Sequence, residues 1–109
     1  GRVGEPSMAA YAASKGGVQG LALSAAATYA PRDIRVNVVA PGLVDTPLAA
    51  RITSNESSRK ASAALHALGR IGQPGEVASA VAWFLHPDQS WVTGQVLGVD
   101  GGLASLRAR

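Results

Sequence analysis

The alternation of apolar and polar positions divides the first half of the chain into a helix followed by a strand. Residues 8–30 are rich in alanine and leucine and contain no proline, which predicts a helix that Pro31 ends. The segment of residues 34–40 is short and rich in β-branched side chains, and Pro41-Gly42 follows it directly. This pattern predicts a strand that ends at a turn.

The second half has the same order. Residues 76–85 predict a helix, with Glu76 in its first turn and Pro87 beyond its end. Residues 95–99 predict a second strand, which the turn sequence Asp100-Gly101-Gly102 closes. Between the two halves, residues 41–75 have a polar middle and predict an irregular connection with one short helix around residues 62–68.

The order helix, strand, long loop, helix, strand predicts an α/β fold with parallel strands. A parallel sheet needs both faces covered, and two short strands make a poor core by themselves. We therefore expect the 109 residues to be a fragment of a larger domain that carries more strands towards its N-terminus.

Composition narrows the function classes. Only 16% of the residues are charged, the net charge is +3, and the arginines form no basic run, so nucleic-acid binding has little support. The absence of cysteine excludes disulfides and thiolate metal sites and fits a reducing cytoplasm. No apolar run approaches the roughly 20 residues of a membrane span, so no membrane insertion is expected. His66 and His86 lack ligand-like spacing, and we expect no metal site.

The stretch YAASKGG places Tyr11 four positions before Lys15. On a helix these positions share a face, so the phenol and the ammonium group can point into one cleft. A phenol has a pKa of about 10, and a nearby positive charge favours its ionised form. Such a tyrosine can exchange a proton with a carbonyl or alcohol oxygen. The alternative is a chance pair of polar residues on an alanine-rich helix.

The stretch VAPGLVDT leads from the first strand into a loop. Ligands of open α/β sheets bind at the carboxyl ends of the strands, and Gly42 permits close backbone approach there. The hydroxyl of Thr46 can bond an amide or a phosphate. The alternative is an ordinary strand-ending turn in which Thr46 caps a helix that starts at Pro47.

Four further polar residues favour structural roles. We expect Asp100 to bond its own turn backbone and Arg70 to fix a loop. His66 and His86 have no evident partner in the sequence, and we expect them at the surface or at helix ends.

In this order and spacing, the motifs resemble those of the short-chain dehydrogenase/reductase family. YAASK is similar to its Tyr-x-x-x-Lys motif, IRVNVVAPGLVDTP to the following strand and loop, and the stretch from Gly69 to Gly102 to its last helix, strand and turn. The similarity is greatest to 3-oxoacyl-carrier-protein reductases and related sugar- and steroid-alcohol dehydrogenases.

The resemblance implies that residues 1–109 are the C-terminal part of a single Rossmann-like domain, a doubly wound parallel sheet that binds NAD or NADP. It implies hydride transfer between the nicotinamide and a small carbonyl or alcohol substrate. Tyr11 matches the proton donor and acceptor, and Lys15 the residue that lowers the tyrosine pKa and binds the nicotinamide ribose. The loop that meets the nicotinamide carboxamide matches Pro41, Gly42, Val44 and Thr46.

The resemblance also implies that residues 47–68 form the variable substrate lid and that the protein self-associates, as a dimer or tetramer. The family's glycine-rich loop, its selector between NAD and NADP and its catalytic serine have no counterpart in the 109 residues, so we expect these residues alone to be inactive. A rival hypothesis is a non-catalytic scaffold that has kept the fold, because Ala12, Gly16, Ala22 and Ala26 allow close helix contact with a partner.

Overall fold

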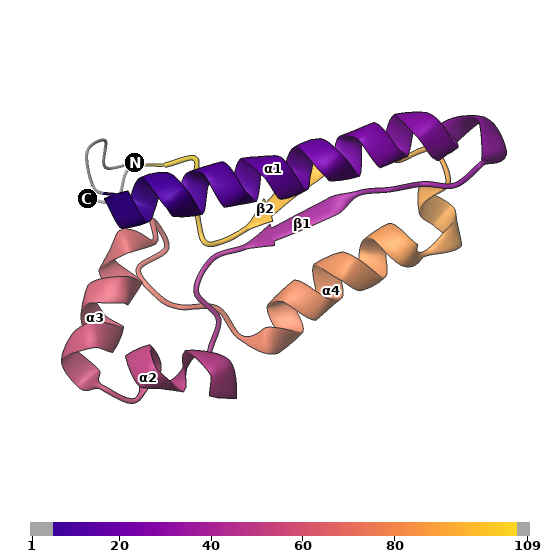
Figure 1. Ribbon diagram of the computed structural model, residues 1–109. Helices are drawn as coiled ribbons and strands as arrows, with labels where there is room; N and C mark the ends of the chain where they lie inside the picture. Colours follow the sequence, from indigo (N-terminus) through magenta and orange to yellow (C-terminus); the bar gives the residue numbers. More distant parts are fainter. Residues whose placement is uncertain (1–5, 107–109) are drawn as a thin grey trace. The chain divides into compact units, whose positions relative to one another are not determined.

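The computed structural model describes the backbone of residues 6–106 and the side chains of residues 16–106. These residues form two compact units, each described by itself. Of the described residues, the first unit comprises 6–38 and 90–96, and the second comprises 39–89 and 97–106. Figure 1 shows the order of the elements along the chain.

The first unit contains the long helix α1, Pro6–Tyr29, and the short 3-10 helix η1, Ala30–Arg32. Pro6 suits the first helical position, because its missing N–H would have no partner there. Asp33 ends the helical region in the left-handed conformation with φ 60°, and its N–H bonds the carbonyl of Ala30. The predicted helix over residues 8–30 is confirmed within two residues at each end.

Strand β1, Val38–Pro41, begins four residues later than the predicted strand over 34–40. The reason lies in Asn37, whose side chain takes hydrogen bonds that a strand would make through its backbone. Its Nδ2 donates to the carbonyl of Val92 (3.1 Å), and its Oδ1 accepts from the N–H of Gln95 (3.0 Å). Regular pairing then starts at Val38, whose N–H donates to the carbonyl of Gln95 at 2.8 Å.

Strand β2, Val96–Val99, pairs with β1 in a two-stranded sheet. The bonds run from the N–H of Val38 to the carbonyl of Gln95 and from the N–H of Gly42 to that of Val99, so both strands advance in the same direction. The parallel arrangement expected from the sequence is confirmed. The loops that follow the two strands therefore leave from the same edge of the sheet.

The region expected to be irregular is more helical than predicted. The 3-10 helix η2, Pro47–Ala49, leads into helix α2, Ala50–Thr53, which packs beside helix α3, Glu56–Leu65 (Figure 1). The expected helix at residues 62–68 is thus misplaced. The cause is Asn55, whose side chain accepts the N–H of Ser58 at 3.0 Å and caps α3 in the middle of a polar run.

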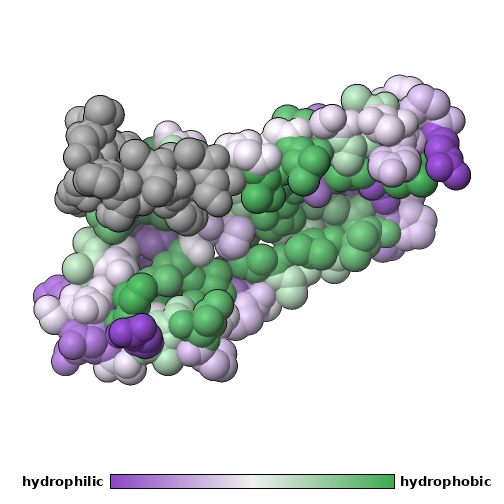
Figure 2. Space-filling model, viewed as in Figure 1, coloured by the Kyte–Doolittle hydropathy of each residue, from purple (hydrophilic) through white to green (hydrophobic). Residues whose placement is uncertain are grey.

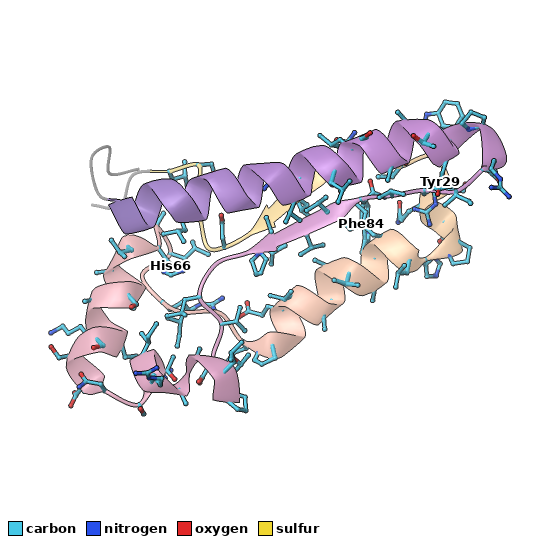
Figure 3. All side chains as sticks on the ribbon, in the orientation of Figure 1. Tyr29, His66 and Phe84 are labelled. Carbon is cyan, nitrogen blue, oxygen red and sulfur yellow. The ribbon has the colours of Figure 1, made fainter. Side chains whose placement is uncertain are left out.

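Helix α4, Pro74–Leu85, follows the prediction closely, and the 3-10 helix η3, Pro87–Gln89, succeeds it. A capping box joins Gln73 and Glu76 at the start of α4, with Pro74 at the first helical position. Phe84 on α4 is buried (Figure 3). Its ring meets that of Trp83 edge-on, with ring centroids 5.3 Å apart.

Little of the described chain is buried. The buried apolar side chains are those of Ala26, Ala40, Ile71 and Phe84. Figure 2 shows many apolar side chains on the visible surface instead, and the most exposed large ones include Leu48, Trp91, Leu21 and Leu85. Among the described helices, none combines the length and the apolar character that a membrane crossing requires.

Candidate functional site

The predicted proton-transfer pair lies on α1. Tyr11 and Lys15 are both positions of this helix, four residues apart. Their side chains lie outside the described residues. The predicted cofactor loop, residues 41–46, belongs to the second unit.

Backbone hydrogen bonds hold this loop on both sides. The N–H of Gly42 donates to the carbonyl of Val99 at 3.2 Å, which continues the pairing of the two strands. Gly72 holds the other side, because its N–H donates to the carbonyl of Leu43 and its carbonyl accepts the N–H of Asp45, each at 2.9 Å. The loop between Pro41 and Thr46 is therefore an extended segment with a fixed register.

Val44 forms an isolated parallel bridge with Gly72, and this decides where its own polar groups point. In such a bridge the flanking residues bond the partner, so the N–H and C=O of Val44 face the opposite side. Neither group has a hydrogen-bond partner among residues 16–106. An amide donor and acceptor that both lack a partner on one side of a strand end can bind a carboxamide.

Gly42 is closely approached by its own chain. A Cβ at this position would lie 2.8 Å from Nε2 of His66 and 3.1 Å from both Cα and Cβ of Asp100. The close approach expected at Gly42 was that of a ligand, whereas the atoms that approach Gly42 in the structure belong to His66 and Asp100.

Thr46 caps η2, since its Oγ1 accepts the N–H of Ala49 at 3.2 Å and Pro47 follows at the first helical position. The capping alternative considered from the sequence is confirmed. The cap uses one lone pair of the hydroxyl and leaves its O–H available as a donor.

His66 lies at a helix end, as predicted, because it follows the last residue of α3 (Figure 3). It is also buried, with 4% of its surface exposed. Its Nε2 accepts the N–H of Leu43 at 3.2 Å, and its Nδ1 lies 2.8 Å from the carbonyl oxygen of Ser62. Because Leu43 is distant in the sequence, no local pattern around His66 could have indicated this contact. His86, in contrast, ends α4 at the surface as predicted.

Arg70 fixes its loop as expected. Its guanidinium binds the Glu76 carboxylate through two bonds of 2.7 and 2.8 Å and also donates to the carbonyl of Ile71. These bonds from Arg70, together with one from the N–H of Gln73, lower the pKa of Glu76 from 4.5 to about 2. Hydrogen bonding to Glu76 likewise raises the pKa of Arg70.

Asp100 has the structural role predicted for it. Its Oδ1 accepts the N–H of Gly102 at 3.0 Å and its Oδ2 that of Ala104 at 3.2 Å. Gly101 and Gly102 both have positive φ, at 58° and 87°, which glycine adopts without strain.

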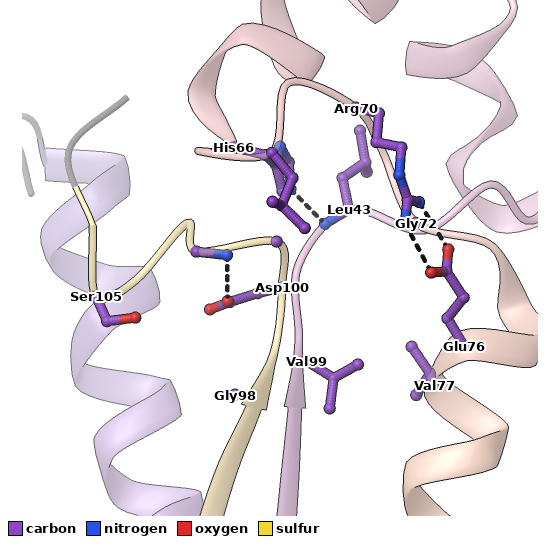
Figure 4. A pocket seen from close by; sticks show the side chains of 13 residues that line it. Leu43, His66, Arg70, Gly72, Glu76, Val77, Gly98, Val99, Asp100 and Ser105 are labelled. Atoms are coloured by element: carbon purple, nitrogen blue, oxygen red, sulfur yellow. Dashed lines mark hydrogen bonds and ion pairs between the residues drawn. The ribbon is translucent and has the colours of Figure 1, made fainter. Parts of the chain in front are cut away.

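These groups surround a hollow of about 320 Å³ in the second unit (Figure 4). Leu43, His66, Arg70, Glu76 and Asp100 line it. One ion pair connects α3 to the loop of residues 41–46, because the guanidinium of Arg59 lies 3.5 Å from the carboxylate of Asp45. No group of three or more potential metal ligands occurs in the described part of the chain.

An α/β chain whose loops leave one edge of a parallel sheet is typical of the Rossmann-like class of nucleotide-binding proteins. Solved structures agree with this. A short chain dehydrogenase family protein from Francisella tularensis superposes with a TM-score of 0.81 and 32% identity, over 95% of this chain and 47% of that one. A 4-hydroxyisoleucine dehydrogenase mutant complexed with NADH and succinate superposes with a TM-score of 0.83 and 28% sequence identity. The match covers 91% of this chain and 41% of that one.

Sequence comparison gives the family. A model described as enoyl-(acyl carrier protein) reductase matches residues 1–104. The 3-oxoacyl-[acyl-carrier-protein] reductase of Thermotoga maritima is 44% identical over 103 residues, 94% of this chain and 41% of that protein. The cis-4-hydroxycyclohexanecarboxylate dehydrogenase of Sinomonas cyclohexanicum is 44% identical over 106 residues, 97% and 42% respectively. The chain belongs to the short-chain dehydrogenase/reductase family, and it spans about two fifths of the length of these relatives.

Proposed function

We propose that the protein is an NAD- or NADP-dependent oxidoreductase that acts on a small alcohol or carbonyl compound. The observation that carries the proposal is the family match over residues 1–104, which contains both the Tyr11–Lys15 pair and the loop from Pro41 to Thr46. In this proposal, residues 1–109 are the C-terminal part of one Rossmann-like domain. The nicotinamide cofactor, when bound, supplies or accepts the hydride.

Tyr11 is the general acid and base of the proposed reaction. In reduction its phenol gives a proton to the carbonyl oxygen of the substrate, and in oxidation its phenolate takes the proton of the alcohol. A phenol with a pKa of about 10 exchanges protons poorly at neutral pH. A cation beside it lowers this pKa, which is the role we assign to Lys15. The remaining donors of Lys15 bind the ribose hydroxyls.

The loop after β1 holds the nicotinamide end of the cofactor. The N–H and C=O of Val44, which face away from Gly72, suit the two hydrogen-bonding groups of a carboxamide. Thr46 adds its O–H as a donor, while its oxygen continues to cap η2. Pro41 and Gly42 fix the backbone at the strand end, because Gly42 leaves room for His66 and Asp100 below the loop.

The helical region over residues 47–68 forms the substrate lid in this proposal. The 3-10 helix η2 begins directly after the Thr46 cap, and α2 and α3 follow it. The proposed lid therefore starts where the cofactor loop ends. We further propose a cytoplasmic location and self-association of the intact protein, in line with the family.

The test is the substitution Tyr11→Phe in the intact protein, with Tyr29→Phe as the matched control. Tyr29 ends the same helix and is 42% exposed. We expect Tyr11→Phe to lower kcat by about 10²–10⁴-fold and to leave NADH and NADPH binding nearly unchanged. Activity retained within a few-fold would refute the role of Tyr11. Absence of any nicotinamide-cofactor binding by the wild type would favour the scaffold hypothesis instead.

A further inference from the structure

One buried imidazole joins the lid to the cofactor loop. His66 follows the last residue of α3, and its Nδ1 lies 2.8 Å from the carbonyl oxygen of Ser62. On its other side, Nε2 accepts the N–H of Leu43 at 3.2 Å (Figure 4). We propose that His66 is a positioning residue that holds the cofactor loop through Leu43 and thereby couples cofactor binding to the lid. The inference rests on the proposed function of the loop.

The two partners of the ring require one protonation state. The carbonyl of Ser62 can only accept, so Nδ1 must carry a proton. The N–H of Leu43 can only donate, so Nε2 must be without one. His66 therefore works as a neutral imidazole in a single tautomer. A second proton on Nε2 would bring two N–H groups face to face and break the contact with Leu43.

The ring has little freedom to move. The chain beyond it is fixed, because the N–H of Leu68 bonds the carbonyl of Gly101 at 2.9 Å and the N–H of Gly69 bonds that of His66 at 2.8 Å. On the loop side, Nε2 lies only 2.8 Å from the point where a Cβ of Gly42 would be. The Leu43 N–H has no other partner among the described residues.

Leu43 is adjacent to Val44, whose N–H and C=O are the groups proposed to bind the carboxamide. The hydrogen bond from Leu43 to His66 thus fixes the chain immediately before the binding residue. Loss of this bond would leave a half-buried N–H without a partner. Rotation of that part of the chain would relieve this at the expense of the geometry at Val44.

Charged groups near His66 are already bound. Among the residues lining the same hollow, Arg70 and Glu76 bind each other, and both carboxylate oxygens of Asp100 accept backbone N–H groups. On α3, Arg59 pairs with Asp45 of the loop. The hydrogen-bond partners of the His66 ring are therefore the two backbone groups of Ser62 and Leu43.

The experiment compares three variants of the intact protein. His66→Phe keeps a flat ring without nitrogen, and His66→Gln supplies an amide oxygen that can accept from Leu43. His86→Gln is the control, because this side chain is 59% exposed at the end of α4. NADH and NADPH affinities are measured by fluorescence titration, and amide hydrogen exchange is followed at Leu43.

We expect His66→Phe to weaken cofactor binding about tenfold or more, and to raise the cofactor KM by more than it lowers kcat. His66→Gln should restore binding to within a few-fold of wild type and keep the Leu43 amide protected from exchange. His86→Gln should behave as wild type. Cofactor binding by a folded His66→Phe within twofold of wild type would overturn the proposal, as would equal exchange at Leu43 in His66→Phe and wild type.

Two outcomes separate this inference from the function on which it rests. A wild type that binds neither cofactor refutes the proposed function, yet exchange at Leu43 still reports whether His66 holds the loop. If His66→Phe fails to fold, His66→Gln and the nitrogen NMR signals of the wild-type ring decide the matter. A wild-type ring protonated on Nε2 at neutral pH would contradict the required tautomer.

Discussion

Replacing Gly42 by alanine tests the packing beneath the cofactor loop. The added Cβ would lie 2.8 Å from Nε2 of His66, closer than such atoms approach, and 3.1 Å from Cα and Cβ of Asp100. Asp100 cannot yield easily, because its Cα is backbone and its carboxylate holds the turn that follows. Either the two strand ends separate or His66 moves.

Both responses have a known magnitude. Forcing a methyl group into a packed site costs about 1–3 kcal/mol. If His66 moves instead, the Leu43 N–H loses its partner, which also costs about 1–3 kcal/mol. Because the two responses are alternatives and the protein adopts the one that costs less, we expect Gly42→Ala to lower the free energy of unfolding by about 1–3 kcal/mol.

The assay is urea denaturation of the intact protein, followed by far-UV circular dichroism. Gly75→Ala is the matched control: this glycine lies in the first turn of α4, and its added Cβ would meet nothing within 4 Å in the described chain. It should leave stability unchanged or raise it by up to about 1 kcal/mol. A Gly42→Ala protein within about 0.5 kcal/mol of wild type would refute the packing argument, since even the smaller response alone exceeds that value.

Two further substitutions test the closing turn and the ion pair. Gly102→Ala should destabilise the protein more than Gly69→Ala. Both glycines have positive φ, at 87° and 75°, but of the two only Gly102 would place an added Cβ against other atoms, 2.8 Å from Cβ of Ala67. Equal denaturation midpoints for the two variants would contradict this. Glu76→Gln should lower the urea midpoint at neutral pH. Because the pKa of Glu76 is lowered from 4.5 to about 2, its stabilising contribution is present above pH 4.5 and lost as the pH falls towards 2, so the wild-type and variant midpoints should converge over that range. A difference that stays constant with pH would contradict the role of the Arg70–Glu76 pair.

Local signals in the sequence were sufficient for the elements whose causes are local. Pro74 and Glu76 mark the start of α4, and the turn at Asp100 follows from a side chain that bonds its own backbone. The start of α3 also had a local signal, the Asn55 cap, but the polar residues around it are equally common in loops. The sequence pattern therefore placed this helix too late.

The features that were missed depend on contacts between distant parts of the chain. Asn37 shortens β1 through bonds to Val92 and Gln95, and His66 is buried because Leu43 offers an N–H to its ring. A pattern read along the chain contains no information about such partners. The loop from Pro41 to Thr46 was singled out by its resemblance to the family's motif. The direction in which the N–H and C=O of Val44 point is known only from the bridge to Gly72.

The bridge between Val44 and Gly72 has a consequence for how this protein can change in evolution. It brings together the two ends of the segment that carries η2, α2 and α3, so this segment leaves the sheet edge and returns to the same place. Once the ends of a loop are held together, doubling its length costs only about 0.6 kcal/mol. This segment can therefore be lengthened, shortened or replaced while the register of residues 41–46 is kept. In the proposed function, the lid and the cofactor loop can in this way diverge independently.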